Sequence, residues 1–545
     1  MIYITVLLLS LFITISLVPL CARLADRLHV YDMPEARKVH THPIPRTGGL
    51  AMALGALVPF AFFATPMPFV KAYMAGVTIL TIVGVLDDVK DLGYRPKFIA
   101  QIAAACLAVF YGGVKISSLG LLLPNDALLP EWIAVPLTLV AIVGVTNAIN
   151  LADGLDGLAG GICLLTFCCI GYLAYQGGNT TVALLSVVMV GAVFGFLRFN
   201  THPASIFMGD TGSQLLGFSA VTFSLVITQG STPLSPVLPL LLLGFPILDT
   251  LAVMFERVHN GRSPFVADKN HFHHKLIRRG FSHSESVLII YVIQAALVTS
   301  AFLLRFHSEW LLLISYVAFS VLVLSAFTLA DHLGWQMKRY HLVDSVIKVK
   351  LRALVAQDLH IRVLGRSIEI VIPVLFFTTC IAMHSVPMQV TILASALLAF
   401  LLFTILIKTN FMTSGLRNLY LLVPFIIYYS EKEPAAWMTE LIHLIYNFSF
   451  VAVALLVILT LKFTRRKQGF RFNLMDFLIL FIALVVPNLP EPQIQSYSLG
   501  LLTTKIIVFL FSFEVLIGEL RGSYGRIAYP TIASLVVLIV RGLLG

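Results

Sequence analysis

Apolar runs of about 17 to 22 residues, each long enough to cross roughly 30 Å of hydrocarbon as a helix, recur along the whole chain between short polar breaks. We count about eighteen such runs. Helices are the expected form, because in lipid every backbone polar group must find its partner inside the segment. The pattern predicts an all-α polytopic membrane protein with about 18 transmembrane helices.

Charged residues are too scarce for a soluble protein. They make up 12% of the 545 residues, against about 25% in a typical soluble domain, while apolar types make up 58%. A soluble chain could not hide that much apolar surface. Composition therefore excludes a cytosolic enzyme, a fibrous protein, a disordered chain and a disulfide-rich secreted scaffold. The six cysteines lack metal-binding spacing, and we expect them to pack within the spans.

Lysine and arginine accumulate in alternate breaks, as expected when basic loops stay on the cytoplasmic side. Five breaks are rich in them: 23–46, 90–97, 257–279, 338–366 and 462–471. We therefore expect the basic breaks in the cytosol and both termini outside it. The first run lacks a basic leader and a small-residue cleavage site, so we expect a retained span. The net charge of +10 reflects this topology, and we expect no nucleic-acid partner.

One long break divides the chain. The segment 331–366 carries apolar residues at helical spacing among Lys and Arg, which is typical of a cytosolic amphipathic helix on the membrane surface. It separates a first region, 1–330, with about eleven spans from a second region, 367–545, with about seven. The second region carries no motif that we recognise. We expect a scaffold or oligomerisation module there, with a partner-binding or lipid-handling domain as the alternative.

Adjacent carboxylates close the third span. Asp87 and Asp88 are followed by Asp91, so three negative charges lie on about one helical turn and repel one another. An end cap would need only one of them. The cluster suits a divalent metal, or a raised pKa that lets one carboxylate act as a base. A solvated loop is the plainer alternative.

More polar residues follow the fifth span and precede the eighth. The stretch 147–159 repeats Asn and Asp around two Asp-Gly pairs and includes Asn150, Asp153 and Asp156. Such turns let backbone and amide groups approach a ligand closely. Asp210 is placed either to cap a helix or to bind Mg²⁺ through oxygen.

The break after the ninth span is rich in histidine. His271, His273 and His274 lie among basic residues without an accompanying cysteine. For that reason we favour an anion site for phosphate over a zinc site. Asp249 lies inside an apolar run and is a functional candidate by default, with a buried hydrogen bond as the plainer reading.

All these groups fall on the predicted cytosolic face, where the active site is expected. Carboxylates for Mg²⁺, an Asn/Asp loop and a basic histidine group suit phosphoryl transfer, which requires charge neutralisation and aligned reactants. Over residues 1 to about 330 the chain resembles the polyprenyl-phosphate N-acetylhexosamine-1-phosphate transferases. The resemblance rests on these motifs: Arg37-Lys38-Val39-His40 with Pro43, Pro45 and Gly48-Gly49; Asp87-Asp88 with Lys97 and Gln101; the 147–159 loop; Pro203-Ala204 with Phe207-Met208-Gly209-Asp210; Pro246 with Asp249; and His271-Phe272-His273-His274.

The resemblance implies a reaction in the bacterial cytoplasmic membrane. Undecaprenyl phosphate would attack the β-phosphate of a UDP-N-acetylhexosamine, releasing UMP and starting a cell-surface glycan. By the same resemblance Asp210 would bind Mg²⁺, with Mn²⁺ as the alternative, Asp88 would deprotonate the lipid phosphate, and Asp87 would support the metal or the base. Eight further residues would hold the nucleotide, phosphates or sugar: Lys97, Asn150, Asp153, Asp156, Phe207, His271, His273 and His274.

Two details favour the GlcNAc-type branch of that family. Asp91 stands where the UDP-MurNAc-pentapeptide transferases carry Lys, and the histidine loop reads His-Phe-His-His in place of three consecutive histidines. The expected substrate is UDP-GlcNAc or a related acetamido sugar, and a UDP-MurNAc-pentapeptide transferase is the alternative within the family. A membrane transporter and a catalytically inactive assembly protein are the alternatives from other classes. A homodimer is an alternative to a single subunit.

Overall fold

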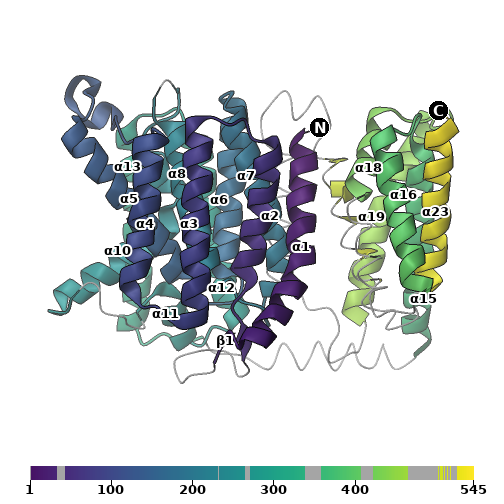
Figure 1. Ribbon diagram of the computed structural model, residues 1–545. Coiled ribbons are helices and arrows are strands. Elements are labelled where there is room, and N and C mark those ends of the chain that lie inside the picture. The colour runs from purple at the N-terminus through teal and green to yellow at the C-terminus, as the bar shows by residue number, and fades with distance from the viewer. Residues whose placement is uncertain are drawn as a thin grey trace. The chain divides into compact units, whose positions relative to one another are not determined.

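The structure, a computed structural model, describes residues 2–33, 43–230, 232–263, 270–337, 358–406, 416 and 422–463, with short stretches between 501 and 516 and residues 525–544. The chain divides into two compact units near residue 338 (Figure 1). Four predicted features lie outside the described residues: the basic motif 37–40, the segment 264–269 before the histidines, the middle of the linker at 338–357, and most of the last basic break at 464–471.

The first unit is a helical bundle with one short ribbon, in which β1 (Tyr31–Asp32) pairs antiparallel with β2 (Ile44–Pro45). Its helices, in chain order, are α1 (Ile2–Leu28), α2 (Gly48–Phe63), α3 (Pro68–Lys90), α4 (Tyr94–Cys106), α5 (Glu131–Ala152), α6 (Leu158–Gln176), α7 (Thr180–Asn200), α8 (Gly209–Thr228), α9 (Pro239–Leu242), α10 (Gly244–His259), α11 (Phe272–Arg278), α12 (His283–Leu304) and α13 (Glu309–His332). A π-helical turn (Leu107–Tyr111) continues α4, and two 3-10 turns follow it (Gly120–Leu122 and Pro124–Asp126).

Eleven of the described helices are long and apolar enough to cross a membrane, eight in the first unit and three in the second. The prediction of an all-α polytopic membrane protein is therefore confirmed. The total of about eighteen spans and the side on which each loop lies stay predictions.

Helix α8 lies at the centre of the first unit, where it packs against α2, α3, α5, α6 and α7. Glycines allow this close packing. A Cβ added at Gly84 of α3 would lie 2.6 Å from the Cα of Thr211, and one added at Gly49 of α2 would lie 2.2 Å from the backbone nitrogen of Gly212. The start of α2 and the end of α3 are thereby brought against the first turn of α8.

The second unit has its own apolar core. It contains α15 (Asp358–Ala382), α16 (Met388–Leu406), α18 (Val423–Lys432), α19 (Glu440–Phe463) and α23 (Gly525–Leu544). Phe376, Phe450, Phe509 and Phe513 meet in this core. Helix α13 ends at His332 and α15 begins at Asp358, so both edges of the predicted linker belong to the flanking helices.

Candidate active site

The end of α3 is joined to the start of α8 through one carboxylate. Asp88 accepts hydrogen bonds from the backbone N–H of Asp210 (3.0 Å), the backbone N–H of Thr211 (3.4 Å) and the hydroxyl of Thr211 (2.7 Å). The free N–H groups in the first turn of α8 are therefore capped by a side chain from another helix. Asp210 itself lies in that first turn and does not cap it.

Glycine is required beside this cap. Gly209 has a φ of 62°, in the left-handed region. A Cβ at this position would also lie 2.4 Å from Oδ1 of Asp88. Both the backbone conformation and the contact with Asp88 exclude a larger residue.

Lys97 links two further predicted residues. Its ammonium group, on the first turn of α4, lies 2.8 Å from Oδ2 of Asp87 and also pairs with Asp210. Asp87 is 5% exposed, and its other oxygen accepts the backbone N–H of Leu92 at 2.9 Å. Residues from α3, α4 and α8 thus form one chain of charges.

The loop after α5 brings more carboxylates to the same place. Burial, together with the negative charges of Asp210, Asp156 and Asp88, raises the pKa of Asp153 to about 7. Asn150 accepts a hydrogen bond from the hydroxyl of Ser213 at 2.9 Å, which ties the end of α5 to α8. Carboxylates crowded in this way suit a hard divalent cation with oxygen ligands, so the residues present fit Mg²⁺.

Asp156 has partners that the sequence interpretation missed. Its Oδ2 lies 2.7 Å from Nδ1 of His202, accepts the backbone N–H of Ala204 at 3.1 Å, and lies 3.8 Å from Nε2 of His283. Burial alone would raise the pKa of Asp156, but the hydrogen bond from His202, the charge of His283 and the hydrogen bond from Ala204 lower it below its ordinary value. His202 directly precedes the Pro203-Ala204 motif and could have been found from it, whereas nothing in the sequence near His283 sets it apart.

The histidine loop adjoins the loop after α5. His273 packs so closely on Gly154 that a Cβ added there would lie 2.3 Å from its Nε2. Burial lowers the pKa of His273 to about 3, with His274, His271 and His283 contributing in the same direction. At neutral pH this imidazole is uncharged, so it could meet a phosphate only as a hydrogen-bond donor. The ring of His274 lies 4.2 Å from that of His273.

Asp249 fixes the start of α11, the helix that carries His273 and His274. Its two oxygens contact Nδ1 of His271 (3.0 Å) and the backbone N–H of Phe272 (2.9 Å). Both side chains of the pair are buried. The plainer reading of Asp249, a buried hydrogen bond to a neighbouring segment, is the one that the structure shows.

Phe207 reaches the site through its backbone. Its N–H donates to the carbonyl of Pro45 at 2.8 Å, and its carbonyl accepts from the N–H of Gly48 at 2.9 Å. The segment before α8 is thereby joined to the segment before α2. Both segments carry motifs on which the family resemblance rests.

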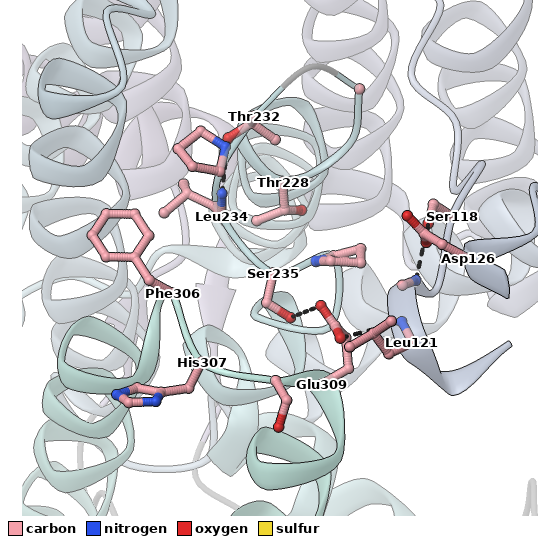
Figure 2. A pocket seen from close by; sticks show the side chains of 15 residues that line it. Ser118, Leu121, Asp126, Thr228, Thr232, Leu234, Ser235, Phe306, His307 and Glu309 are labelled. Atoms are coloured by element: carbon pink, nitrogen blue, oxygen red, sulfur yellow. Dashed lines mark hydrogen bonds between the residues drawn. The ribbon is translucent and has the colours of Figure 1, made fainter. Parts of the chain in front are cut away.

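A cavity of about 410 Å³ lies at the other end of α8, next to Thr228. Figure 2 shows Glu309 there, accepting hydrogen bonds from the hydroxyl of Ser235 and the backbone N–H of Leu121, both at 3.2 Å. These bonds tie two loops to the start of α13. The 20 residues of α8, about 30 Å of helix, separate this cavity from the carboxylates. None of the predicted site residues lines it.

Comparison with known proteins gives two findings. The family model described as glycosyl transferase family 4 matches residues 70–228, which run from α3 to the end of α8 and include Asp87, Asp88, Asp153, Asp156 and Asp210. The chain is 38% identical over 307 residues to the probable undecaprenyl-phosphate N-acetylglucosaminyl 1-phosphate transferase of Bacillus subtilis (strain 168), covering 55% of this chain and 85% of the relative.

Two further relatives carry a similar name, undecaprenyl-phosphate alpha-N-acetylglucosaminyl 1-phosphate transferase. The one from Escherichia coli (strain K12) is 32% identical over 316 residues, with 56% of this chain and 86% of the relative covered. The one from Yersinia pestis is 31% identical over 299 residues, with 53% and 82% covered. Each alignment spans most of the relative but little more than half of this chain.

Proposed function

The chain belongs to the polyprenyl-phosphate N-acetylhexosamine-1-phosphate transferases of glycosyl transferase family 4, and from this membership we propose that it transfers GlcNAc-1-phosphate from UDP-GlcNAc to undecaprenyl phosphate, with release of UMP. The names of the relatives favour the GlcNAc-type branch over the UDP-MurNAc-pentapeptide alternative. Membership of a transferase family does not support the transporter alternative.

The observation that carries the proposal is the meeting of Asp88, Asp153 and Asp210 with Lys97 at one end of the bundle. A reaction between a lipid phosphate and a nucleoside diphosphate sugar brings several negative charges together. Cationic groups are needed to offset them and to hold the reactants in line. Lys97 is the side chain placed to contact a phosphate. It pairs with Asp87 and Asp210, and a bound cation could replace it as their partner and so release its ammonium group for the phosphate.

We assign the metal position to Mg²⁺ held by Asp210, with Asp87 in support. When bound, the ion would withdraw charge from the diphosphate of the donor. Mn²⁺ remains the alternative, since it accepts the same oxygen ligands. The crowding that raises the pKa of Asp153 is the kind of negative potential that such an ion relieves.

The other roles follow from the family resemblance, and the contacts of the residues support them. Asp88 would take the proton from the lipid phosphate, and the donors of the first turn of α8 fix its carboxylate in position. Asn150, at the end of α5, Asp153 and Asp156, on the loop after it, and Phe207 would hold the nucleotide. His271, His273 and His274 would contact phosphates or sugar.

Turnover by the purified full-length protein tests the function directly. With Mg²⁺, undecaprenyl phosphate and radiolabelled UDP-GlcNAc, we expect labelled lipid and UMP in equal amounts. Asp210→Asn should abolish both products, whereas Asp126→Asn, at the opposite end of the bundle, should leave the rate unchanged. If no UDP-acetamido sugar yields either product, the proposed function is wrong.

We further propose that the protein lies in a bacterial cytoplasmic membrane with this site on the cytosolic side. The basic residues Arg46 and Lys90 lie at the same end of the bundle as the carboxylates, and Arg46 pairs with Asp91 at 3.5 Å. Basic loops are retained in the cytosol. A cysteine introduced at the exposed Tyr94 should therefore react with an impermeant thiol reagent in inverted vesicles and not in spheroplasts.

A further inference from the structure

Three elements that are distant in sequence meet around Asp156. Asp156 lies on the loop between α5 and α6, His202 lies between α7 and α8, and His283 begins α12. The rings of His202 and His283 stack with centroids 4.1 Å apart and planes inclined by 19°. The side chains of Asp156 and His283 are 13% and 8% exposed, and that of His202 is 39% exposed.

The contacts of Asp156 are unequal between its two oxygens. The hydrogen bonds from His202 and Ala204 and the approach of His283 all fall on Oδ2. Within the described residues, Oδ1 accepts no hydrogen bond, and it is not among the polar atoms sealed from solvent. One oxygen is therefore fixed in place, and the other is free to accept a donor from a ligand.

We propose that His202 and His283 are positioning residues that hold Asp156 so that its Oδ1 accepts an N–H or O–H donor of the nucleotide sugar. This inference rests on the proposed function, because that function supplies the ligand. His202 acts through its bond from Nδ1 to Oδ2. His283 acts mainly as a buried flat surface that fixes the ring of His202 by stacking on it, since its Nε2, 3.8 Å from Oδ2, lies beyond hydrogen-bond distance of that oxygen.

A metal ion is the competing reading of the same three residues, since their ligand atoms all lie within 4.8 Å of one another. The stacked rings argue against it. The lone pair of an imidazole nitrogen lies in the ring plane, so an ion bound by two histidines must lie close to both planes. Two planes inclined by only 19° and stacked face to face converge far from the rings. Stacking therefore suits a clamp, in which His202 and His283 hold the carboxylate of Asp156, better than joint coordination of a metal ion.

The clamp predicts that its loss weakens the binding of UDP-GlcNAc and leaves the turnover of bound substrate nearly unchanged. The hydrogen bond from the nucleotide sugar to the carboxylate of Asp156 is charge-assisted, and such a bond contributes about twice what a neutral one does. Loss of this bond should raise the KM for UDP-GlcNAc about tenfold. If Asp156 binds substrate and transition state equally, kcat should change by less than about twofold. The KM for undecaprenyl phosphate should not change, because the proposed role of Asp156 concerns only the nucleotide sugar.

Matched variants of the full-length protein test each part. His202→Ala should show the tenfold rise in KM, and His202→Asn, which keeps a donor near the position of Nδ1, should recover most of it. His283→Ala should raise KM, whereas His283→Phe, which keeps a flat ring without nitrogens, should stay close to wild type. His307→Ala, at the distant cavity, serves as the control. The affinity of each variant for UDP-GlcNAc, measured by calorimetry without lipid, should follow the same order.

Three results would overturn the clamp. The first is a KM for His202→Ala equal to that of wild type, and the second is a failure of His202→Asn to recover binding in a variant that unfolds at the wild-type temperature. The third is one equivalent of Zn²⁺ retained by wild type after dialysis and lost in His202→Ala, which would make the cluster a metal site. Absence of turnover by the wild type would instead count against the proposed function, and the calorimetric affinities would still decide the clamp.

Discussion

The carboxylate of Asp88, on α3, accepts the backbone N–H of Asp210, on α8, at 3.0 Å. The two residues are 122 positions apart in the chain, and each was expected to serve the reaction by itself. Their contact means that the proposed base also completes the helix that carries the proposed metal ligand. Changing either one alters the surroundings of the other.

Asp88→Asn should abolish turnover and also lower stability. An amide can present only one acceptor oxygen, so at least one N–H of the first turn of α8 loses its partner, at a cost of about 0.5 to 2 kcal/mol. Thr211→Val is the matched control, since it removes the hydroxyl donor and leaves the carboxylate. It should lower the unfolding temperature by a similar amount while retaining measurable product formation. Equal turnover by Asp88→Asn and wild type would exclude Asp88 as the base.

Activation by Mg²⁺ should weaken as the pH falls through 7. Burial and neighbouring carboxylates raise the pKa of Asp153 to about 7, so this group gains a proton below that pH. Protonation removes part of the negative potential that attracts the ion, and cation binding and proton binding therefore compete. The half-saturating Mg²⁺ concentration should rise up to about tenfold per pH unit below 7 and level off above 8, in steady-state assays. A constant value from pH 6 to 8 would contradict this.

The same raised pKa has a consequence for stability. A carboxylate whose pKa is higher in the folded than in the unfolded protein stabilises the fold at low pH, and this contribution is lost as the pH rises through 7. Without Mg²⁺, Asp153→Asn should therefore unfold at a higher temperature than wild type at pH 8, and the difference should shrink at pH 5. Thermal unfolding in detergent measures this, and Asp126→Asn is the control.

Lys97→Met should lower the stability of the protein even without bound substrate. It leaves the nearly buried Asp87 and the carboxylate of Asp210 without their shared cation, a loss of about 1 to 3 kcal/mol. Lys97→Arg keeps the charge and should retain the unfolding temperature. Turnover by the Met variant should fall at least a hundredfold. A Met variant as stable and as active as wild type would show that the pairing has no role.

Asp249→Ala should lower kcat/KM about tenfold without abolishing expression, because it releases His271 and the first N–H of α11, which positions His273. Since Asp249 and His271 act through one hydrogen bond, the double variant Asp249→Ala/His271→Ala should be little worse than either single one. Fully additive losses in this double-mutant cycle would mean that the two residues act independently.

A chain ending near residue 337 should retain transferase activity. The family relatives are matched over 82% to 86% of their length by little more than half of this chain, and every proposed site residue lies in the first unit. The measurement is product formation by the shortened protein in membranes at matched expression. Loss of activity in a shortened chain that still binds UDP-GlcNAc would assign the second unit a part in catalysis.

The fold class and much of the site could be predicted because the chain has so few charges. A long apolar run that crosses lipid must satisfy its own backbone hydrogen bonds, which favours a helix. A carboxylate within or next to such a run stands out. Asp87, Asp88, Asp153 and Asp210 were identified in this way, and the structure brings them to one end of the bundle.

The remaining features depend on contacts between distant segments. Nothing near Asp88 shows that it caps α8, because the helix it serves begins more than a hundred residues later. His283 looks like the start of an ordinary span, and its importance comes from stacking on His202. Asp249 was singled out for its apolar surroundings, yet it is held by a histidine that the sequence analysis had assigned to phosphate. Patterns of residue type show where polar groups occur, and only the packed structure shows which of them meet.

Under the proposed assignment of Mg²⁺ to Asp210, the position of Lys97 between Asp87 and Asp210 bears on the stability of the protein without metal. Carboxylates without a cation repel one another, whereas the ammonium group of Lys97 offsets the negative charges of Asp87 and Asp210. Removal of Mg²⁺ should therefore leave the protein folded, and the proposed transferase activity should return in full when Mg²⁺ is added back.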